Sequence, residues 1–187
     1  MIISGSDPYT QASFSFSNRL ARLAWTCVEL TLFRFSPRPL HRWRAFLLRL
    51  FGAKLGSHVH VYPGARIWAP WNLRTESYVG VADNVRIYNI AEVHLGERCV
   101  VSQGAFLCTG SHDIDSSNFQ LIADSIRLGR HTWICAEVFV GPGVEIADGC
   151  VIAARAVVVK SIRDVWTVWA GNPVQYKRDR SKSSGVV

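Results

Sequence analysis

Aliphatic residues return at every sixth position through the second half of the chain, and they form one unbroken series: Leu128, Ile134, Val140, Ile146, Ile152 and Val158. Four residues after each of them stands a small or branched side chain, in the order Thr132, Val138, Val144, Cys150, Ala156 and Ile162. An amphipathic helix repeats near 3.6 residues and a half-buried strand near 2, so neither produces a period of six. Short strands separated by tight turns do produce it, with three strands in a coil of roughly 18 residues.

The same spacing predicts which side chains face the core. Alternate residues of a strand share a face, so Thr132 and Ile134 point inward while Trp133 between them points outward. The same rule turns four further residues outward, namely Phe139, Glu145, Val151 and Val157. Successive coils then stack at strand spacing, about 4.8 Å apart. We therefore predict an all-β fold, a parallel β-helix shaped as a triangular prism, over residues 55–170.

The pattern extends upstream in three shorter blocks, whose aliphatic positions are Leu55, Val61 and Ile67, then Val81, Ile87 and Val93, then Leu95, Val101 and Leu107. Shifts of two residues separate the blocks, and we interpret them as uneven corners near residues 68–71 and 88–90. Chance spacing in an apolar-rich chain remains the alternative for residues 55–93.

The period fails after the hexad Leu107–His112, which reads LCTGSH. Residues 113–127, DIDSSNFQLIADSIR, are rich in turn-forming Asp, Ser and Asn, so we expect a loop that leaves the prism. The interval from Leu107 to Leu128 is 21 residues, which we count as one coil plus a surplus of three. Within the hexad Leu107–His112, Ser111 occupies the inward position and His112 the outward position at the root of the loop.

A histidine at this break has two interpretations. Histidine is the residue type most often used as a general base, and loops on rigid scaffolds often carry catalytic groups. Alternatively, His112 only hydrogen-bonds the loop. The residues alone leave both interpretations open.

Two helices are predicted before the prism. Apolar spacing at Leu20, Leu23, Cys27 and Leu30 indicates a helix within residues 17–35, which Pro37 and Pro39 end. A second helix follows, with one apolar side: Leu40, Trp43, Leu47, Leu50 and Phe51. Its arginines are expected largely elsewhere: Arg38, Arg42, Arg44 and Arg49. These helices either cap the open end of the β-helix or dock on an anionic bilayer, and both roles are compatible.

The chain therefore divides into an N-terminal helical cap segment (1–54), the β-helix with its loop (55–170) and a C-terminal extension (171–187), whose end RDRSKSSGVV is expected to be disordered. With 187 residues and 49% hydrophobic content, the chain is expected to form one domain. The formal charge of +7 suits an anionic membrane, nucleic acid or a phosphorylated ligand. Because the basic residues gather in the helices and the tail, we expect no nucleic-acid partner.

Cysteine usage and hydropathy bear on the compartment. Five cysteines without a CxxC spacing favour a reducing compartment over a disulfide framework. No apolar stretch is long enough to span a bilayer, and the amino terminus lacks the pattern of a secretory signal. We expect a cytoplasmic protein, with the inner face of the membrane as a further location if the helices dock there.

Three motifs carry a resemblance to a known family. LCTGSHD, then TWICAEVFVGPGVEIADG, then AGNP resemble the left-handed β-helix hexapeptide-repeat acyltransferases over about residues 25–180. LHRWRAFLLRLFGAKLG resembles the colanic-acid biosynthesis acetyltransferase subgroup in particular. The resemblance implies a homotrimer with active sites at subunit interfaces and acetyl-CoA as acyl donor. It also implies a saccharide hydroxyl as acceptor, on a free or a lipid-linked saccharide, in cell-surface polysaccharide biosynthesis, and no metal.

The resemblance also assigns roles to residues. His112 matches the family's general base, and Asp113 or Ser111 is a candidate to orient its ring. The backbone N–H of Ala136 matches the family's oxyanion donor. This sequence has Cys135, Ala136 and Glu137 where relatives often carry Gly or Ser, and a backbone donor survives that change. The residues implied to bind acetyl-CoA are Trp133, Ala136, Ala154, Lys160, Gly171, Asn172, Pro173 and Arg178.

Some of these residues keep a second interpretation. Trp133 could instead be buried in a trimer contact, and Arg178 could be an ordinary solvated charge. Tyr88 and Asn89 lie opposite the loop by coil counting, which makes them candidate contacts for the acceptor.

Two other functions fit a prism of this kind. A carbonic anhydrase of the γ type holds zinc with three outward histidines, including a pair five residues apart, and the six histidines here contain no such pair: His41, His58, His60, His94, His112 and His131. A non-catalytic binding protein is the other alternative, because a fold does not fix a function.

Overall fold

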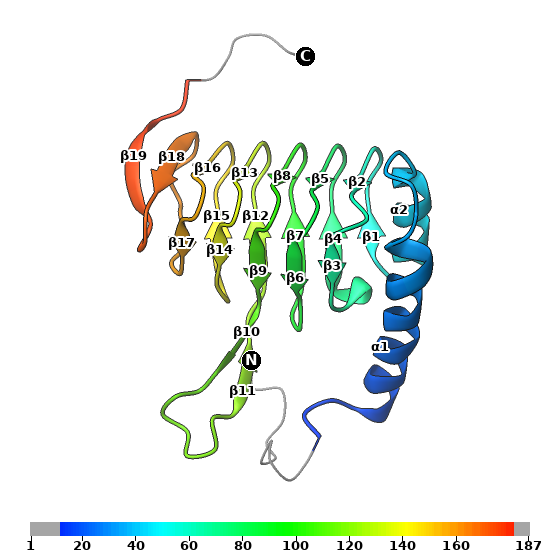
Figure 1. Cartoon of the computed structure of the whole chain (residues 1–187). Coiled ribbons are helices and arrows are strands. Elements are labelled where there is room, and N and C mark those ends of the chain that lie inside the picture. Colours follow the sequence, from blue (N-terminus) through cyan, green and yellow to red (C-terminus); the bar gives the residue numbers. More distant parts are fainter. Residues whose placement is uncertain (1–11, 182–187) are drawn as a thin grey trace.

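The structure is a computed structural model, and it describes residues 12–181. Two helices lead into a stack of short strands, and one hairpin projects from the stack (Figure 1). The first helix, α1, is Phe16–Val28 and continues as a π-helical turn, η1, at Glu29–Phe33. The second helix, α2, is His41–Leu50. Between residues 12 and 181, no helix is long and apolar enough to cross a bilayer.

Three parallel sheets form the prism, and we call them walls 1, 2 and 3. Wall 1 contains β1 (Lys54–Leu55), β4 (Leu73–Thr75), β7 (Val93–Leu95), β12 (Ile126–Leu128) and β15 (Glu145–Ile146). Wall 2 contains β2 (His60–Val61), β5 (Gly80–Val81), β8 (Val100–Val101), β13 (Trp133–Ile134) and β16 (Val151–Ile152), followed by β18 (Thr167–Ala170) and the antiparallel β19 (Gln175–Asp179). Wall 3 contains β3 (Arg66–Ile67), β6 (Arg86–Tyr88), β9 (Phe106–Cys108), β14 (Phe139–Val140) and β17 (Val157–Val158).

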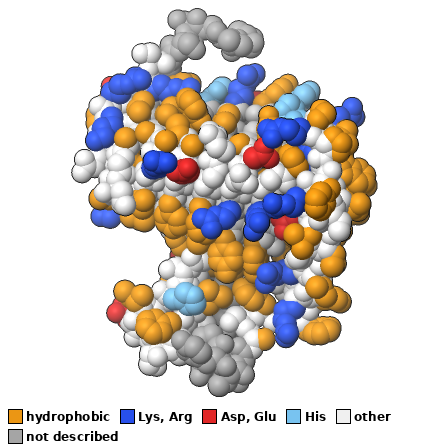
Figure 2. Space-filling model, viewed as in Figure 1, with side chains coloured by type: hydrophobic (Ala, Val, Ile, Leu, Met, Phe, Trp, Pro, Cys, Tyr) orange, Lys and Arg blue, Asp and Glu red, His pale blue; other side chains and the backbone are white. Residues whose placement is uncertain are grey.

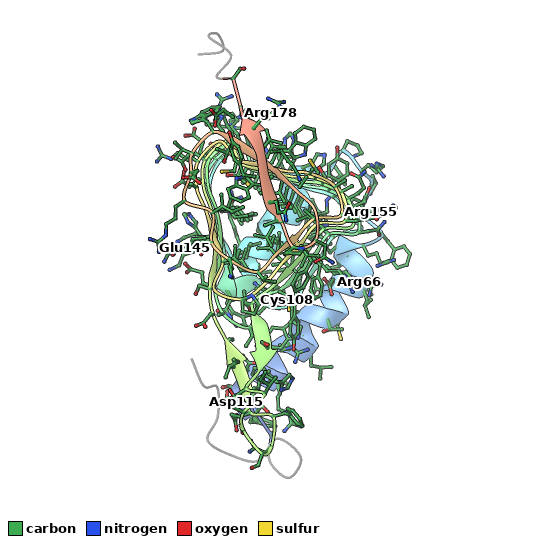
Figure 3. The ribbon with its side chains drawn as sticks, turned by 90° about the vertical axis from the view of Figure 1, so that its left-hand side faces the viewer. Arg66, Cys108, Asp115, Glu145, Arg155 and Arg178 are labelled. Atoms are coloured by element: carbon green, nitrogen blue, oxygen red, sulfur yellow. The ribbon has the colours of Figure 1, made fainter. Side chains whose placement is uncertain are left out.

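The coils are left-handed. Each coil passes from wall 1 to wall 2 to wall 3. Figure 3 looks along the axis with the C-terminal coils toward the viewer, and there Glu145 marks wall 1, Arg155 the corner after wall 2, and Cys108 the far end of wall 3. These positions follow one another clockwise. A chain that turns clockwise while it advances toward the viewer is left-handed, so the predicted fold is confirmed.

The six-residue period places side chains as predicted. Both inward series, Leu128 to Val158 and Thr132 to Ile162, are buried along their whole length. Register explains the match, since Ile134 pairs with Ile152 in the next coil and equivalent positions stack directly. Trp133 faces outward and is 47% exposed. Backbone N–H groups of one coil donate to carbonyls of the neighbouring coil, for example Cys135 to Ile152 at 3.0 Å.

The upstream blocks belong to the same prism, with longer coils. Leu55 pairs with Thr75, and Thr75 pairs with Leu95, which gives an interval of 20 residues where the later coils have 18. The predicted shift of two residues is thus confirmed. One uneven corner contains a 3₁₀ turn, η2, at Pro70–Asn72. Asn89 of the next coil holds this corner, because its side chain donates to the Ala69 carbonyl and accepts from the Ala69 N–H.

The break in the period is a β-hairpin. Strands β10 (Gly110–His112) and β11 (Leu121–Ala123) pair antiparallel and project from the corner between wall 3 and wall 1. Our count of one coil plus three was wrong, because Leu107 lies in wall 3 and Leu128 lies in the next wall, wall 1. In the next coil the same step, from Val140 to Ile146, takes only six residues. Nearly the whole segment therefore leaves the prism.

The limits of this excursion differ from the predicted loop 113–127. The hairpin already begins at Gly110, and Ile126 and Arg127 have returned to wall 1 in β12. The prediction that Ser111 points inward was also wrong: Ser111 is exposed in β10, and Thr109 is the last buried residue before the hairpin.

The helices close the first coil, but α1 uses a different face from the one predicted. Trp25 and Phe33 are buried against the prism, and the Trp25 indole donates to the Ile67 carbonyl at 2.6 Å. The carboxylate of Glu29 accepts from the Ile67 N–H at 3.0 Å. The predicted leucine face points outward, with Leu23 62% exposed. The large aromatic side chains fill the open end, and the leucine stripe is left on the surface.

The second helix confirms its predicted apolar side in part. Leu47 of that side is buried and Phe51 packs against the core, whereas Trp43 and Leu50 of the same side are exposed. Arg44, predicted to point away from the core, is fully buried. Its guanidinium donates to the Val61 carbonyl at 2.6 Å, the Ser36 hydroxyl at 2.8 Å and the carbonyls of Pro37 and Arg38. One arginine thus ties the loop between the helices to wall 2.

The substitution Arg44→Met should destabilise the protein by about 2–4 kcal/mol, because it leaves buried carbonyls without a donor. Arg42→Met, on the exposed side of the same helix, is the control and should change stability by less than about 0.5 kcal/mol. Thermal or urea unfolding measures both. Equal losses in the two variants would contradict the role assigned to Arg44.

Candidate functional site

His112 lies on β10, where the hairpin leaves the prism, and its side chain is exposed. Its Nδ1 is 2.6 Å from the backbone carbonyl oxygen of Phe119 across the hairpin. A carbonyl oxygen only accepts hydrogen bonds, so Nδ1 carries the hydrogen. The neutral ring then has its lone pair on Nε2, the nitrogen that a general base uses.

The group that orients the ring is a backbone carbonyl, and neither side chain proposed from the sequence does so. Asp113 accepts from the Asp115 N–H at 3.1 Å, and its own N–H donates to the Gln120 carbonyl at 2.8 Å. Its carboxylate therefore shapes the tip of the hairpin. Sequence reasoning could not find the Phe119 carbonyl, because every residue has one and only the antiparallel pairing brings this one to His112.

Trp133 and Ala136 lie on wall 2 and at the corner that follows it. The Trp133 indole donates to the Ser102 hydroxyl of the preceding coil at 2.9 Å, which fixes the position of the ring. Ala136 occupies this corner, and its carbonyl accepts from the Arg155 N–H. Within residues 12–181, no acceptor lies within bonding distance of the Ala136 N–H.

The next coil repeats this corner at Ala154, which stacks on Ala136 because Ile152 pairs with Ile134. Further toward the C-terminus, Gly171 accepts from the Val157 N–H at 3.1 Å and leads into the cis peptide Asn172–Pro173. These residues form one column along the edge of wall 2. Arg178 is exposed on β19, opposite Val168.

Lys160 lies outside this column. It follows β17 of wall 3, and the chain then meets wall 1 where Ile162 bridges to Ile146. Lys160 is therefore at the corner from which the hairpin projects, two coils further along the axis.

One chain does not bring His112 and Ala136 together. The hairpin projects from the corner between walls 3 and 1, and Ala136 lies at the corner between walls 2 and 3. Figure 3 shows both corners: the hairpin with Asp115 lies at one end of wall 3 and Arg155 at the other. The width of a wall separates the candidate base from the candidate oxyanion donor.

The two residues predicted to contact the acceptor, Tyr88 and Asn89, lie in different environments. Tyr88 faces outward on wall 3 and is half-buried, and burial raises the pKa of its hydroxyl. A Cβ placed on Gly110 would lie 3.0 Å from the Tyr88 ring, so Tyr88 packs against the base of the hairpin. The prediction for Asn89 was wrong, because its side chain is fully buried and both amide ends bond Ala69.

The histidines are spread over the fold. His41 stacks on His60 with ring centroids 4.6 Å apart, and His58 stacks on Tyr78. In the part of the chain that the structure describes, no three His, Cys, Asp or Glu side chains gather in a way that could hold a metal ion.

Comparison with known proteins adds independent findings. The profile of the bacterial transferase hexapeptide family (six repeats) matches residues 125–160. The Escherichia coli (strain K12) protein named colanic acid biosynthesis acetyltransferase WcaF is 44% identical over 167 residues, which cover 89% of this chain and 91% of that protein.

Solved structures share the fold at lower identity. A maltose O-acetyltransferase from Clostridium difficile 630 superposes with a TM-score of 0.82 at 21% identity and covers 90% of each chain. A galactoside acetyltransferase in complex with coenzyme A gives a TM-score of 0.80 at 20% identity, over 97% of this chain and 92% of that one. These likenesses extend over the helices as well as the prism.

The hydrogen bond to Phe119 predicts the tautomer of His112. At a pH where the imidazole is neutral, the hydrogen should reside on Nδ1, with Nε2 unprotonated. Two-bond ¹H–¹⁵N correlation spectra of protein labelled at histidine distinguish the two nitrogens, and His112→Gln assigns the signal. A ring protonated on Nε2 would refute this geometry.

Proposed function

The chain belongs to the hexapeptide-repeat acetyltransferases, and from this membership and the geometry of His112 we propose that it transfers the acetyl group of acetyl-CoA to a saccharide hydroxyl. The observation that carries the proposal is the bond from His112 Nδ1 to the Phe119 carbonyl, which leaves Nε2 free to accept a proton. The 44% identity to a protein named for colanic acid biosynthesis favours an acceptor in cell-surface polysaccharide synthesis.

His112 acts as the general base. Its Nε2 takes the proton from the acceptor hydroxyl as that oxygen attacks the acetyl carbonyl, and the Phe119 carbonyl stabilises the imidazolium through Nδ1–H. His112 then returns the proton to the departing sulfur. His112 is thus neutral again at the end of the reaction, and no covalent bond to the protein forms.

Ala136 stabilises the charge that develops on the carbonyl oxygen. Its N–H lies at a rigid corner, and a fixed backbone donor needs no reorganisation when the charge forms. Acetyl-CoA, when bound, supplies an acetyl group activated as a thioester. Exposed groups along the edge of wall 2 fit such a long ligand, from Trp133 past Ala154 to the turn at Gly171, Asn172 and Pro173.

Cationic side chains suit the phosphates of the donor. Lys160 and Arg178 are exposed near the C-terminal coils, and neither forms an ion pair within residues 12–181. Ammonium and guanidinium groups in such positions bind phosphate oxygens. We assign both to the nucleotide end of the donor, with Arg178 from the copy whose wall 2 edge holds the donor and Lys160 from the adjacent copy, whose hairpin corner faces that edge.

The active form is a homotrimer. Because His112 and Ala136 lie at opposite corners of wall 3, a site that uses both requires Ala136 and Trp133 from an adjacent copy. A cyclic trimer provides this arrangement three times, with each hairpin reaching the wall 2 edge of a neighbour.

The N-terminal helices dock on an anionic bilayer at the inner face of the membrane. More than half of the exposed large hydrophobic side chains described in the structure lie on or beside α1, η1 and α2: Phe16, Leu20, Leu23, Leu30, Leu32, Phe35, Leu40, Trp43, Phe46 and Leu50. Figure 2 shows hydrophobic side chains along the helical edge of the molecule. Exposed arginines lie among them: Arg19, Arg34, Arg38, Arg42 and Arg49. Apolar anchors flanked by cations are the features that bind anionic lipid surfaces, and a lipid-linked saccharide is presented there.

His112→Gln should lower kcat about 10²- to 10⁴-fold with little change in KM for acetyl-CoA, because it removes the base without removing a donor contact. CoA release and the added acetyl mass on a panel of glycans measure transfer. Asp113→Asn should lose less than about tenfold, and light scattering should show a trimeric mass for both. Wild-type turnover in His112→Gln would rule out the mechanism.

The membrane proposal predicts binding to vesicles that contain phosphatidylglycerol, and weak binding to vesicles of phosphatidylcholine alone. Leu23→Glu/Phe46→Glu places charges on the apolar surface and should reduce cosedimentation at least about tenfold. Ile114→Glu, on the exposed hairpin, is the control and should bind as wild type. Undiminished binding of the double variant would contradict the proposal.

A further inference from the structure

A cavity of about 330 Å³ lies between α1 and the outer face of wall 3, and the proposed mechanism does not account for its lining. Four aromatic rings and three arginines dominate it: Trp25, Trp68, Tyr88, Phe106, Arg22, Arg66 and Arg86. Figure 2 shows basic side chains beside a hydrophobic patch in the middle of this face. Glu29 is the one acidic residue of the lining.

The arginines of this cavity form no ion pair within residues 12–181, in contrast to Arg127, Arg130 and Arg155 elsewhere in the fold. Arg66 and Arg86 occupy paired positions on β3 and β6, so two like charges stand directly opposite each other. Such a pair destabilises a sheet unless something compensates it. On wall 1 the equivalent pairing joins Arg127 to Glu145, with the ionic groups 3.8 Å apart. No carboxylate of residues 12–181 lies within 4.0 Å of Arg66 or Arg86.

Arg22 approaches the same cavity from α1. Its guanidinium lies 3.8 Å from the centre of the Trp68 ring, and its buried Nε has no acceptor in the structure. Arg86 lies over Phe106 in the same way, at 4.2 Å. Contact with an aromatic face holds a guanidinium in place and leaves its N–H groups available for hydrogen bonds.

Glu29 does not neutralise these three cations. Its carboxylate accepts from the Ile67 N–H; burial raises the pKa of this carboxyl, while that hydrogen bond and the charge of Arg66 lower it. One carboxylate faces three guanidinium groups. The lining therefore keeps a positive charge that a bound anion can satisfy.

The cavity adjoins the hairpin that carries His112. Tyr88 lines it, and the Tyr88 ring contacts the position of Gly110, the first residue of β10. His112 is two residues further along that strand. A ligand held by the arginines can thus present a second part of its structure to the imidazole.

We propose that this cavity binds an acidic saccharide, with Arg22, Arg66 and Arg86 holding a carboxylate or phosphate group and the aromatic rings stacking on the sugar. Guanidinium groups match both anions through paired hydrogen bonds. The proposal rests on the proposed function, since it defines the chemical class of the acceptor. The arginines are specificity-determining residues, and they take no part in proton transfer.

The test is equilibrium binding without acetyl-CoA, by NMR titration at fixed ionic strength, of three small pyranosides. These are methyl β-glucuronide, glucose 1-phosphate and neutral methyl β-glucoside. At least one charged probe should bind tenfold to a hundredfold more tightly than the neutral one, as expected for hydrogen bonds to a charged group. Preference for the glucuronide identifies a uronic acid, and preference for the phosphate identifies a phosphorylated or diphosphate-linked sugar.

Arg66→Gln/Arg86→Gln should abolish the preference for the charged probe and leave the neutral probe unaffected. Arg74→Gln is the matched control, since Arg74 occupies an outward strand position on wall 1 and should keep the preference. His112→Gln should bind all probes as wild type, which separates this proposal from the catalytic one. Equal binding of charged and neutral probes by the wild type, or an unchanged preference in the double variant, would overturn it.

Discussion

The parallel ladder of backbone hydrogen bonds between coils is the constraint on which the rest of this structure depends. Each wall strand donates to the coil on one side and accepts from the other, so every coil must return to the same three walls. Equivalent positions then stack on one another, as Ile134 does on Ile152. The interior of a triangular prism is narrow, and only aliphatic and small side chains fit there. The six-residue period of the sequence follows from this geometry.

The same constraint decides where function can be placed. An insertion within a wall strand would break the hydrogen-bond ladder on both sides. At a corner, by contrast, the chain can leave the prism and return to it with the ladder intact. The hairpin of residues 110–123 leaves at a corner and returns in register, with Ile126 paired to Val93. It forms its own antiparallel bonds, and those bonds place the Phe119 carbonyl against His112. The cost of leaving the ladder is thus offset by the pairing that orients the imidazole.

The wall positions were predictable from sequence because burial there repeats at a fixed spacing. The corner at Pro70–Asn72 was visible only as a shift of two residues. The role of Asn89 in holding it was hidden, since a polar residue opposite the loop by coil counting looks like a ligand contact. The face of α1 was assigned wrongly because α1 has apolar residues on two sides, and spacing does not tell which side meets the prism. Arg44 was misplaced because most of its partners are backbone carbonyls. Every residue has a carbonyl, so the sequence does not show which of them the guanidinium will contact.

The candidate site was predictable only in part, for a related physical reason. His112 was identified by the break in the period, but the group that orients it belongs to the backbone. The arginine cavity was not predicted, because Arg66 and Arg86 are 20 residues apart and become neighbours only through the longer coils. A sequence reader who knows the coil length can find such pairs by looking for like charges one coil apart.

Stacking of like residues also has a consequence for how specificity evolves in a prism. On wall 3 the outward column runs from Arg66 and Arg86 to Phe106 and Phe139, so the surface changes from charged to aromatic along the axis. A neighbouring pair of cations raises the energy of the empty protein, and a bound anion lowers it again. The ladder that forces Arg66 and Arg86 together therefore makes an anion site out of two ordinary strand positions, and the fold needs no dedicated loop to build it. Because the proposed base, His112, is on the adjacent hairpin, the proposal implies that a change in this column alters which sugar is held without disturbing the group that removes its proton.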